Sequence, residues 1–212
     1  MTGREELAAL VDSVEEQLRA THVAREKALP LCRRVIQQSA SSIRSIHRLE
    51  PERAADFAGA AEADLRAAQE ALASFPSVAH AGFLHDAAKE YVEARLTAAL
   101  VEGTPLPGAD DLGVPGAAWL NGLAEAASEL RRHLLDRLRE GELDRGEELL
   151  ERMDEVYDVL VGIDFPDAVT SGLRRTVDAL RAVVERTRGD VTTTALQVRL
   201  QRALEETSGS GG

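Results

Sequence analysis

Apolar residues recur at three- and four-residue intervals along nearly the whole chain, which is the spacing of one face of an α-helix. The first such face carries Leu7, Val11, Val14 and Leu18. The alternating pattern and turn pairs that indicate a β-hairpin are not found. Strong helix formers (Ala, Leu, Glu and Arg) dominate the sequence, and aromatic residues make up only 3% of it. The sequence therefore predicts an all-α protein with an aliphatic core.

Prolines and glycines divide this pattern into about seven helices, or eight with a short last one, of a single bundle. Pro30 is expected to kink or start a helix, and Gly189 to end one. No boundary between domains is visible, so residues 1–206 are expected to form one helical domain, followed by a flexible Gly/Ser tail over residues 207–212. A segment with three prolines and three glycines, residues 102–115, is expected to be a loop. The expected helices cover about residues 7–18, 23–48, 51–73, 78–101, 117–139, 144–161, 171–188 and, as a short last one, 193–205.

Charge and cysteine content limit the possible functions. Taken alone, the formal net charge of -12 argues against a phosphate-binding surface, which usually shows as a basic face, although a local arginine patch can occur in an acidic protein. The single cysteine, Cys32, cannot form an internal disulfide. No apolar run approaches the ~18 residues of a membrane span, and the N-terminus lacks the order of a signal peptide. A cytoplasmic protein without a membrane partner is expected.

Carboxylates interrupt the apolar surface of the segment 78–101. This segment is apolar almost all round, as expected for a buried helix. Asp86, Glu90, Glu93 and Thr97 nevertheless form a polar stripe along it. Buried carboxylates are costly unless they are paired or bind a metal. The stripe is therefore a candidate site.

The segment 117–139 carries a matching set of acids. Small residues, among them Gly122, share a face with Glu125 and Glu129 and would let another helix approach closely. If they face Glu90 and Glu93, the four side chains would form a four-carboxylate cage, which suits a hard divalent ion. From spacing alone, ordinary solvent-facing glutamates remain the alternative, because the chain has 37 acidic residues. A di-iron bundle is excluded, since no histidine has a glutamate three residues before it.

Four segments, in order, resemble the translin family. Residues 89–94, K-E-Y-V-E-A, are similar to the Q-E-Y-V-E-A of translin-associated factor X. Residues 122–130, G-L-A-E-A-A-S-E-L, are similar to its G-V-A-D-L-T-G-E-L, and residues 173–181 resemble the L-R-K-R-Y-D-G-L-K of translin. The resemblance covers about residues 23–190. The match to a long first helix that ends in L-H-R involves Arg33, Ser39, Ile43, His47 and Arg48.

This resemblance implies a bundle of about seven helices that assembles into a closed hexamer or octamer and binds single-stranded RNA or DNA. The factor X branch is a magnesium-dependent endoribonuclease, and this chain has acids at all four matching positions. The resemblance thus assigns catalysis and the binding of Mg²⁺, or Mn²⁺, to Glu90, Glu93, Glu125 and Glu129. Position 125 is Asp in that branch. The extra methylene moves the carboxylate by about 1 Å, a displacement that can cost ~100-fold in rate.

Positive side chains are needed for the phosphate backbone of a nucleic acid. Arg33, His47 and Arg48 match family positions, and Arg131 and Arg132 begin a second basic cluster. For each arginine the alternative is a surface salt bridge. The scarcity of aromatics argues against base-stacking platforms. Two other functions stay open: a nucleic-acid-binding relative that does not cleave, and a helical assembly protein without a nucleic-acid role.

Overall fold

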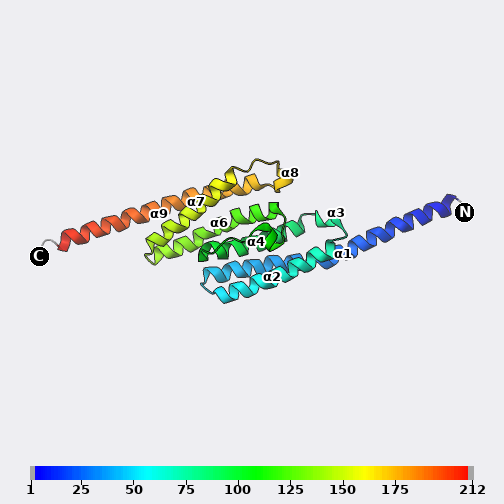
Figure 1. The fold of residues 1–212 in the computed structure, drawn as a ribbon, viewed down its shortest axis with the longest axis horizontal. Helices are drawn as coiled ribbons and strands as arrows, with labels where there is room; N and C mark the ends of the chain where they lie inside the picture. The colour runs from blue at the N-terminus through cyan, green and yellow to red at the C-terminus, as the bar shows by residue number, and fades with distance from the viewer. Residues whose placement is uncertain (1–2, 210–212) are drawn as a thin grey trace.

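The computed structural model describes residues 3–209, which form nine helices and no strand (Figure 1). The all-α prediction is confirmed. The expected number of seven or eight helices is too low, because three four-residue helices lie in the connections. The helices are α1 (Gly3–His47), α2 (Pro51–Leu72), α3 (Pro76–Ala79), α4 (Phe83–Glu102), α5 (Ala109–Leu112), α6 (Gly116–Arg139), α7 (Leu143–Val161), α8 (Asp167–Thr170) and α9 (Leu173–Gly209).

Helix α6 occupies the middle of a single bundle. It packs against α4 on one side and against α7 and α9 on the other, while α1 packs against both α2 and α4. One continuous aliphatic core results, with Leu65, Leu96, Leu130 and Leu180 almost completely buried. A buried amide, Asn121 of α6, donates to the Thr170 carbonyl and so ties α6 to α8.

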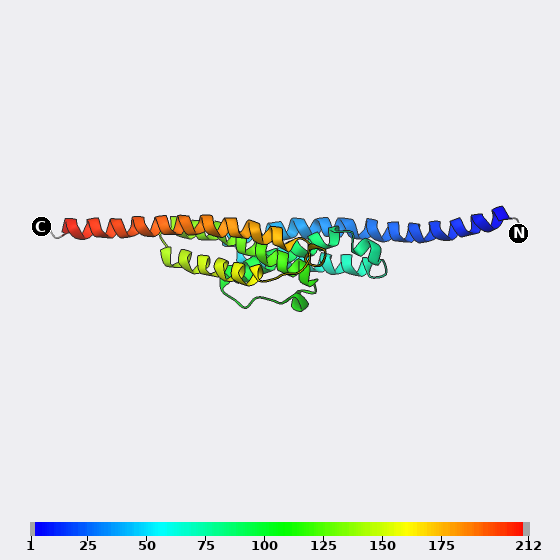
Figure 2. The ribbon, with the colours of Figure 1, turned by 90° about the horizontal axis from the view of Figure 1, so that it is seen from above.

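Helices α1 and α9 extend beyond the bundle in opposite directions (Figures 1 and 2). The expected end of a helix at Gly189 is wrong, since this residue lies inside α9. The helices expected over residues 7–18 and 23–48 are one helix, α1, so Pro30 does not start a helix but lies within one. A proline inside a helix costs ~3 kcal/mol. Burial of Ala28, Cys32 and Val35 on either side of Pro30 offsets that cost. A glycine costs only ~1 kcal/mol relative to alanine, which a helix packed along the bundle tolerates.

The connections differ from the expected boundaries in smaller ways. The expected helix over 78–101 is split into α3 and α4 at Gly82, whose φ of 94° is in the left-handed region. The expected loop over 102–115 contains α5. Helix α9 continues to Gly209, and residues 210–212 of the expected Gly/Ser tail lie outside the described residues. None of the described helices is both long and apolar enough to cross a membrane.

Candidate metal centre

A glycine sets the distance between α4 and α6. A Cβ atom on Gly122 would lie 2.6 Å from Cγ1 of Val92 and 2.9 Å from the backbone oxygen of Lys89. Real Cβ atoms do not approach other atoms so closely, so only glycine permits this crossing. The sequence-based expectation that small residues bring these two helices together is confirmed.

Three carboxylates meet at this crossing. Glu90 and Glu93 of α4 and Glu125 of α6 each offer an oxygen atom, and these oxygens all lie within 4.8 Å of one another. Glu93 is the most deeply buried of the three. The structure thus brings together two acids from one helix and one from the other, as the helical spacing predicts. We call these three residues the carboxylate cluster.

The fourth expected acid, Glu129, lies outside the carboxylate cluster and contacts a histidine. Its Oε2 atom is 2.8 Å from Nε2 of His47, so this contact joins α1 to α6. The His47 side chain is only 2% exposed. Its second ring nitrogen, Nδ1, is buried and has no hydrogen-bond partner among residues 3–209. In this arrangement His47, expected from the sequence to contact nucleic acid, faces Glu129 instead of solvent.

The carboxylate cluster changes the acidity of Glu93. Burial is the main cause that raises the pKa of Glu93 from 4.5 to about 8, and the charges of Glu125, Glu90 and Glu129 add to it. Lys89 acts in the opposite direction. Near neutral pH the Glu93 carboxyl group therefore retains a proton unless a cation enters.

One cation in this region was not anticipated from the sequence. The Lys89 ammonium contacts Oε2 of Glu125 and lies 3.3 Å from Oε1 of Glu90. Burial lowers the pKa of Lys89, but the hydrogen bond and charge of Glu125, together with Glu90, raise it above its ordinary value. The side chain is 19% exposed. The only hint in the sequence is that Lys89 directly precedes Glu90.

The candidate nucleic-acid-binding arginines divide into two groups. Arg131 is 2.7 Å from Asp190 and donates to Thr187, so it braces α6 against α9. Arg33, Arg48 and Arg132 are exposed and form no ion pair with any residue that the structure describes.

A shallow groove of about 500 Å³ places arginines next to the acids. It is lined by Glu129 together with Arg131, Arg132 and Arg139 of α6. The rest of the expected basic cluster is not available there: Arg137 pairs with Glu140 at 2.8 Å, and His133 is buried. Burial, followed by the charge of Arg137, lowers the pKa of His133. Arg139 pairs with Asp136 at 3.5 Å, so among the described residues Arg132 is the arginine of this groove that has no ion pair. One edge of the candidate centre thus places an unpaired cation beside Glu129.

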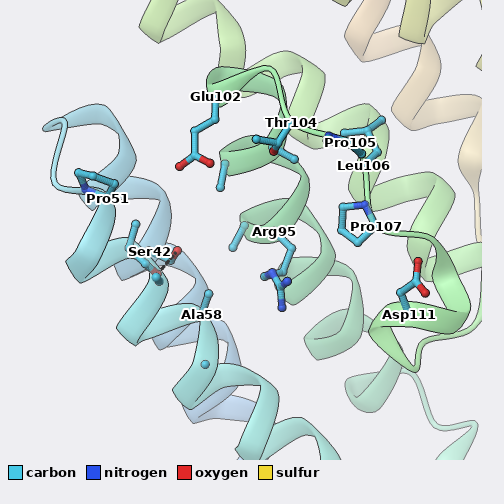
Figure 3. Close-up of a pocket in the computed structure, with 16 residues that line it drawn as sticks. Ser42, Pro51, Ala58, Arg95, Glu102, Thr104, Pro105, Leu106, Pro107 and Asp111 are labelled. Atoms are coloured by element: carbon cyan, nitrogen blue, oxygen red, sulfur yellow. Dashed lines mark hydrogen bonds between the residues drawn. The ribbon is translucent and has the colours of Figure 1, made fainter.

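A second groove, of about 610 Å³, lies between α2, α4 and the residues that follow α4 (Figure 3). It is lined largely by alanines and prolines, and none of the four glutamates reaches it. Its arginine, Arg95, is held by the Tyr91 hydroxyl at 2.8 Å and by Glu62 at 3.4 Å. This groove is therefore separate from the candidate metal centre.

Comparisons with known proteins show what this sequence and fold are similar to. No protein-family model matches the sequence. An uncharacterised protein of Methanocaldococcus jannaschii is 27% identical over 183 residues, which are 85% of this chain and 81% of that protein. The crystal structure of AfC3PO, from Archaeoglobus, is similar with a TM-score of 0.81 and 32% identity, over 88% of this chain and 97% of that one.

Two further solved structures are similar to this chain. The complex of AfC3PO with duplex RNA matches with a TM-score of 0.73 and 33% identity, over the same shares of the two chains, 88% and 97%. Apo-NeC3PO, from Nitrosomonas, has a TM-score of 0.77 but only 19% identity, over 87% of this chain and 96% of that one, so it supports the fold alone.

A helical bundle with an acidic crossing between two central helices defines the class of protein: an all-α protein of the translin type. More particularly, the chain belongs to the C3PO family, that of translin and translin-associated factor X. The resemblance carried by the four sequence segments is thereby confirmed.

Proposed function

We propose that this protein binds RNA and hydrolyses its phosphodiester backbone with the help of Mg²⁺ or Mn²⁺. The observation that carries the proposal is the carboxylate cluster of Glu90, Glu93 and Glu125 at a helix crossing, where Glu93 is buried and the other two are half-buried. The relative AfC3PO has been solved in complex with duplex RNA, which supports RNA as the ligand. From the resemblance we expect single-stranded RNA or DNA to be accepted as well.

The donor set fits a hard divalent ion. Three carboxylates from two helices offer oxygen atoms within 4.8 Å of one another, and Mg²⁺ and Mn²⁺ prefer oxygen ligands. The raised pKa of Glu93 has its origin in burial and like charge, which a cation relieves. Glu129, which contributes to that repulsion, is the fourth acid of the proposed centre and is positioned by His47.

Side chains of this protein could position both a water molecule and the RNA backbone for hydrolysis. A bound Mg²⁺ supplies a lowered pKa for water and neutralises charge on the scissile phosphate. Glu93, or Glu90, would orient the attacking water from α4. In-line attack would leave a 5′-phosphate and a 3′-hydroxyl. The exposed side chains of Arg132, Arg48 and Arg33 would hold the phosphate backbone, and binding through the backbone gives little sequence preference.

The protruding ends of the long helices support assembly into a closed homo-oligomer, a hexamer or an octamer. The N-terminal part of α1 exposes an apolar ridge, and each of its side chains is at least 54% exposed. Such a ridge is costly to leave in water. Light scattering would give the subunit number. The ridge consists of Leu7, Leu10, Val11, Val14 and Leu18.

A cleavage assay tests the proposal. End-labelled RNA, single-stranded or annealed to its complement, is incubated with Mg²⁺ or with EDTA. We expect cleavage only with Mg²⁺, its loss in Glu93→Gln, and its retention in Glu102→Gln, which alters an exposed glutamate of the same helix. Binding without cleavage would instead indicate a non-cleaving member of the family. Neither binding nor cleavage would indicate an assembly protein.

A further inference from the structure

A positively charged side chain of the protein itself occupies part of the proposed metal centre. The ammonium of Lys89 contacts Glu125 and lies 3.3 Å from Glu90, two of the three residues in the carboxylate cluster. These contacts use the same carboxylate groups that would bind a divalent ion. In the metal-free protein, Lys89 is therefore the cation that partly neutralises the carboxylate cluster.

The choice of lysine here stands out from the rest of the sequence. The chain has 25 basic residues, of which only two are lysines, Lys27 and Lys89. Lys27 is exposed on α1. Arginine binds carboxylates through a planar fork with several fixed donors, whereas lysine presents a compact charge on a flexible stem. The basic side chain that contacts the carboxylate cluster, Lys89, is thus of the more flexible kind, which can move away from its partners.

We propose that Lys89 is a resident counter-cation, which a divalent ion must displace from Glu125 and Glu90, so that Lys89 sets the metal affinity of the centre. This inference rests on the proposed function, because it assumes that the carboxylate cluster binds metal. The partial exposure of the side chain, 19%, gives the ammonium a route to solvent. The helices need not move, since the crossing at Gly122 fixes them.

The physical argument is one of competing charges. An ammonium beside a carboxylate repels a second cation at that carboxylate, and a like charge within ~4–6 Å typically changes a binding equilibrium by tenfold or more. Removing the Lys89 charge should therefore strengthen metal binding. It should also leave Glu90, Glu93 and Glu125 without a cation in the metal-free state, and so destabilise that state.

Calorimetric titration with Mn²⁺ alone tests the inference. We expect Lys89→Gln to bind Mn²⁺ at least ~10-fold more tightly than wild type. Lys27→Gln makes the same change of charge at an exposed site and should leave the affinity unchanged. Lys89→Arg keeps the charge and should show no gain. Equal or weaker binding by Lys89→Gln would overturn the proposal.

Stability measurements guard against a variant that simply folds poorly. Without metal, Lys89→Gln should melt at a lower temperature than wild type, and saturating Mn²⁺ should remove the difference. A deficit that persists with Mn²⁺ bound would show that Lys89 is only structural.

The reactivity of the two lysines gives a readout on the wild-type protein. With an acetylating reagent and mass spectrometry, adding Mg²⁺ should increase the labelling rate of Lys89 severalfold and leave that of Lys27 unchanged. Unchanged Lys89 labelling at saturating Mg²⁺ would contradict displacement.

The metal centre and the role of Lys89 can be disproved separately. If wild type binds Mn²⁺, Glu93→Gln does not, and Lys89→Gln binds like wild type, then the metal centre stands and only the role of Lys89 falls. If neither wild type nor Lys89→Gln binds Mn²⁺, the metal centre and the inference both fall.

Discussion

Replacing Glu93 with glutamine should remove a loss of stability that the metal-free protein undergoes as the pH rises. The pKa of Glu93 is about 8 in the folded chain against 4.5 ordinarily. Between these two values the folded state holds a proton that the unfolded state lacks. Wild-type stability should therefore be complete below about pH 4.5 and fall as the pH rises towards 8. Glutamine is neutral throughout, so Glu93→Gln should lack this loss.

The structure sets the size of this effect. The difference between 4.5 and about 8 corresponds to at most ~5 kcal/mol, at ~1.4 kcal/mol for each pH unit. Glu93 is repelled by the charges of Glu90 and Glu125. Small movements of these side chains will relieve part of the repulsion, so the measured difference in stability should be smaller than this upper bound. We expect Glu93→Gln to be more stable than wild type by about 2–4 kcal/mol at pH 8, and by less than ~0.5 kcal/mol at pH 5.

Urea and thermal unfolding in EDTA between pH 5 and pH 8.5 would measure this difference. For a chain of this length, ~1 kcal/mol shifts the melting temperature by about 2–4 °C. Glu102→Gln, at an exposed position of α4, is the matched control and should follow wild type. Parallel pH profiles for wild type and Glu93→Gln would refute the argument, because they would show that the Glu93 carboxylate is well solvated.

Other predictions follow from single contacts. Gly122→Ala should destabilise the protein by about 1–3 kcal/mol in urea unfolding, because its Cβ would collide with Val92 and the Lys89 backbone; Gly59→Ala on α2, where nothing lies within 4 Å, should be neutral or stabilising, and equal effects would disprove the tight crossing. His47→Ala should cost about 1–3 kcal/mol through the loss of its bond to Glu129, and an unchanged urea midpoint would show that this contact contributes nothing. Arg132→Gln should weaken RNA binding and reduce its salt dependence, whereas Arg202→Gln, at an exposed site near the end of α9, should not; equal affinities in a filter-binding titration would remove Arg132 from the interface.

Helical spacing and residue size indicated where three of the four expected acids would meet, although spacing alone did not distinguish them from solvent-facing glutamates. Glu90 and Glu93 are three residues apart and so share a face of α4, and Glu125 stands one turn after Gly122 on α6. Glycine at that position marks the close approach, which the structure confirms. Helix periodicity and residue size are local properties, and the sequence carries them directly.

Contacts between distant segments could not be predicted in this way. His47 and Glu129 are 82 positions apart, and no pattern in either segment specifies that they meet. The Lys89 side chain could equally have pointed into solvent, because its direction depends on the position of Glu125 on another helix. The expected helix end at Gly189 was also wrong, because tertiary packing outweighs the local cost of a glycine inside α9.

The central claim is that α4 and α6 together hold a divalent ion. Anomalous diffraction from crystals of the protein soaked in Mn²⁺ tests it most directly. We expect a manganese peak bounded by the carboxylates of Glu90, Glu93 and Glu125, with the Lys89 ammonium moved away from Glu125. A map with no peak at this crossing, in crystals that bind manganese elsewhere, would contradict it.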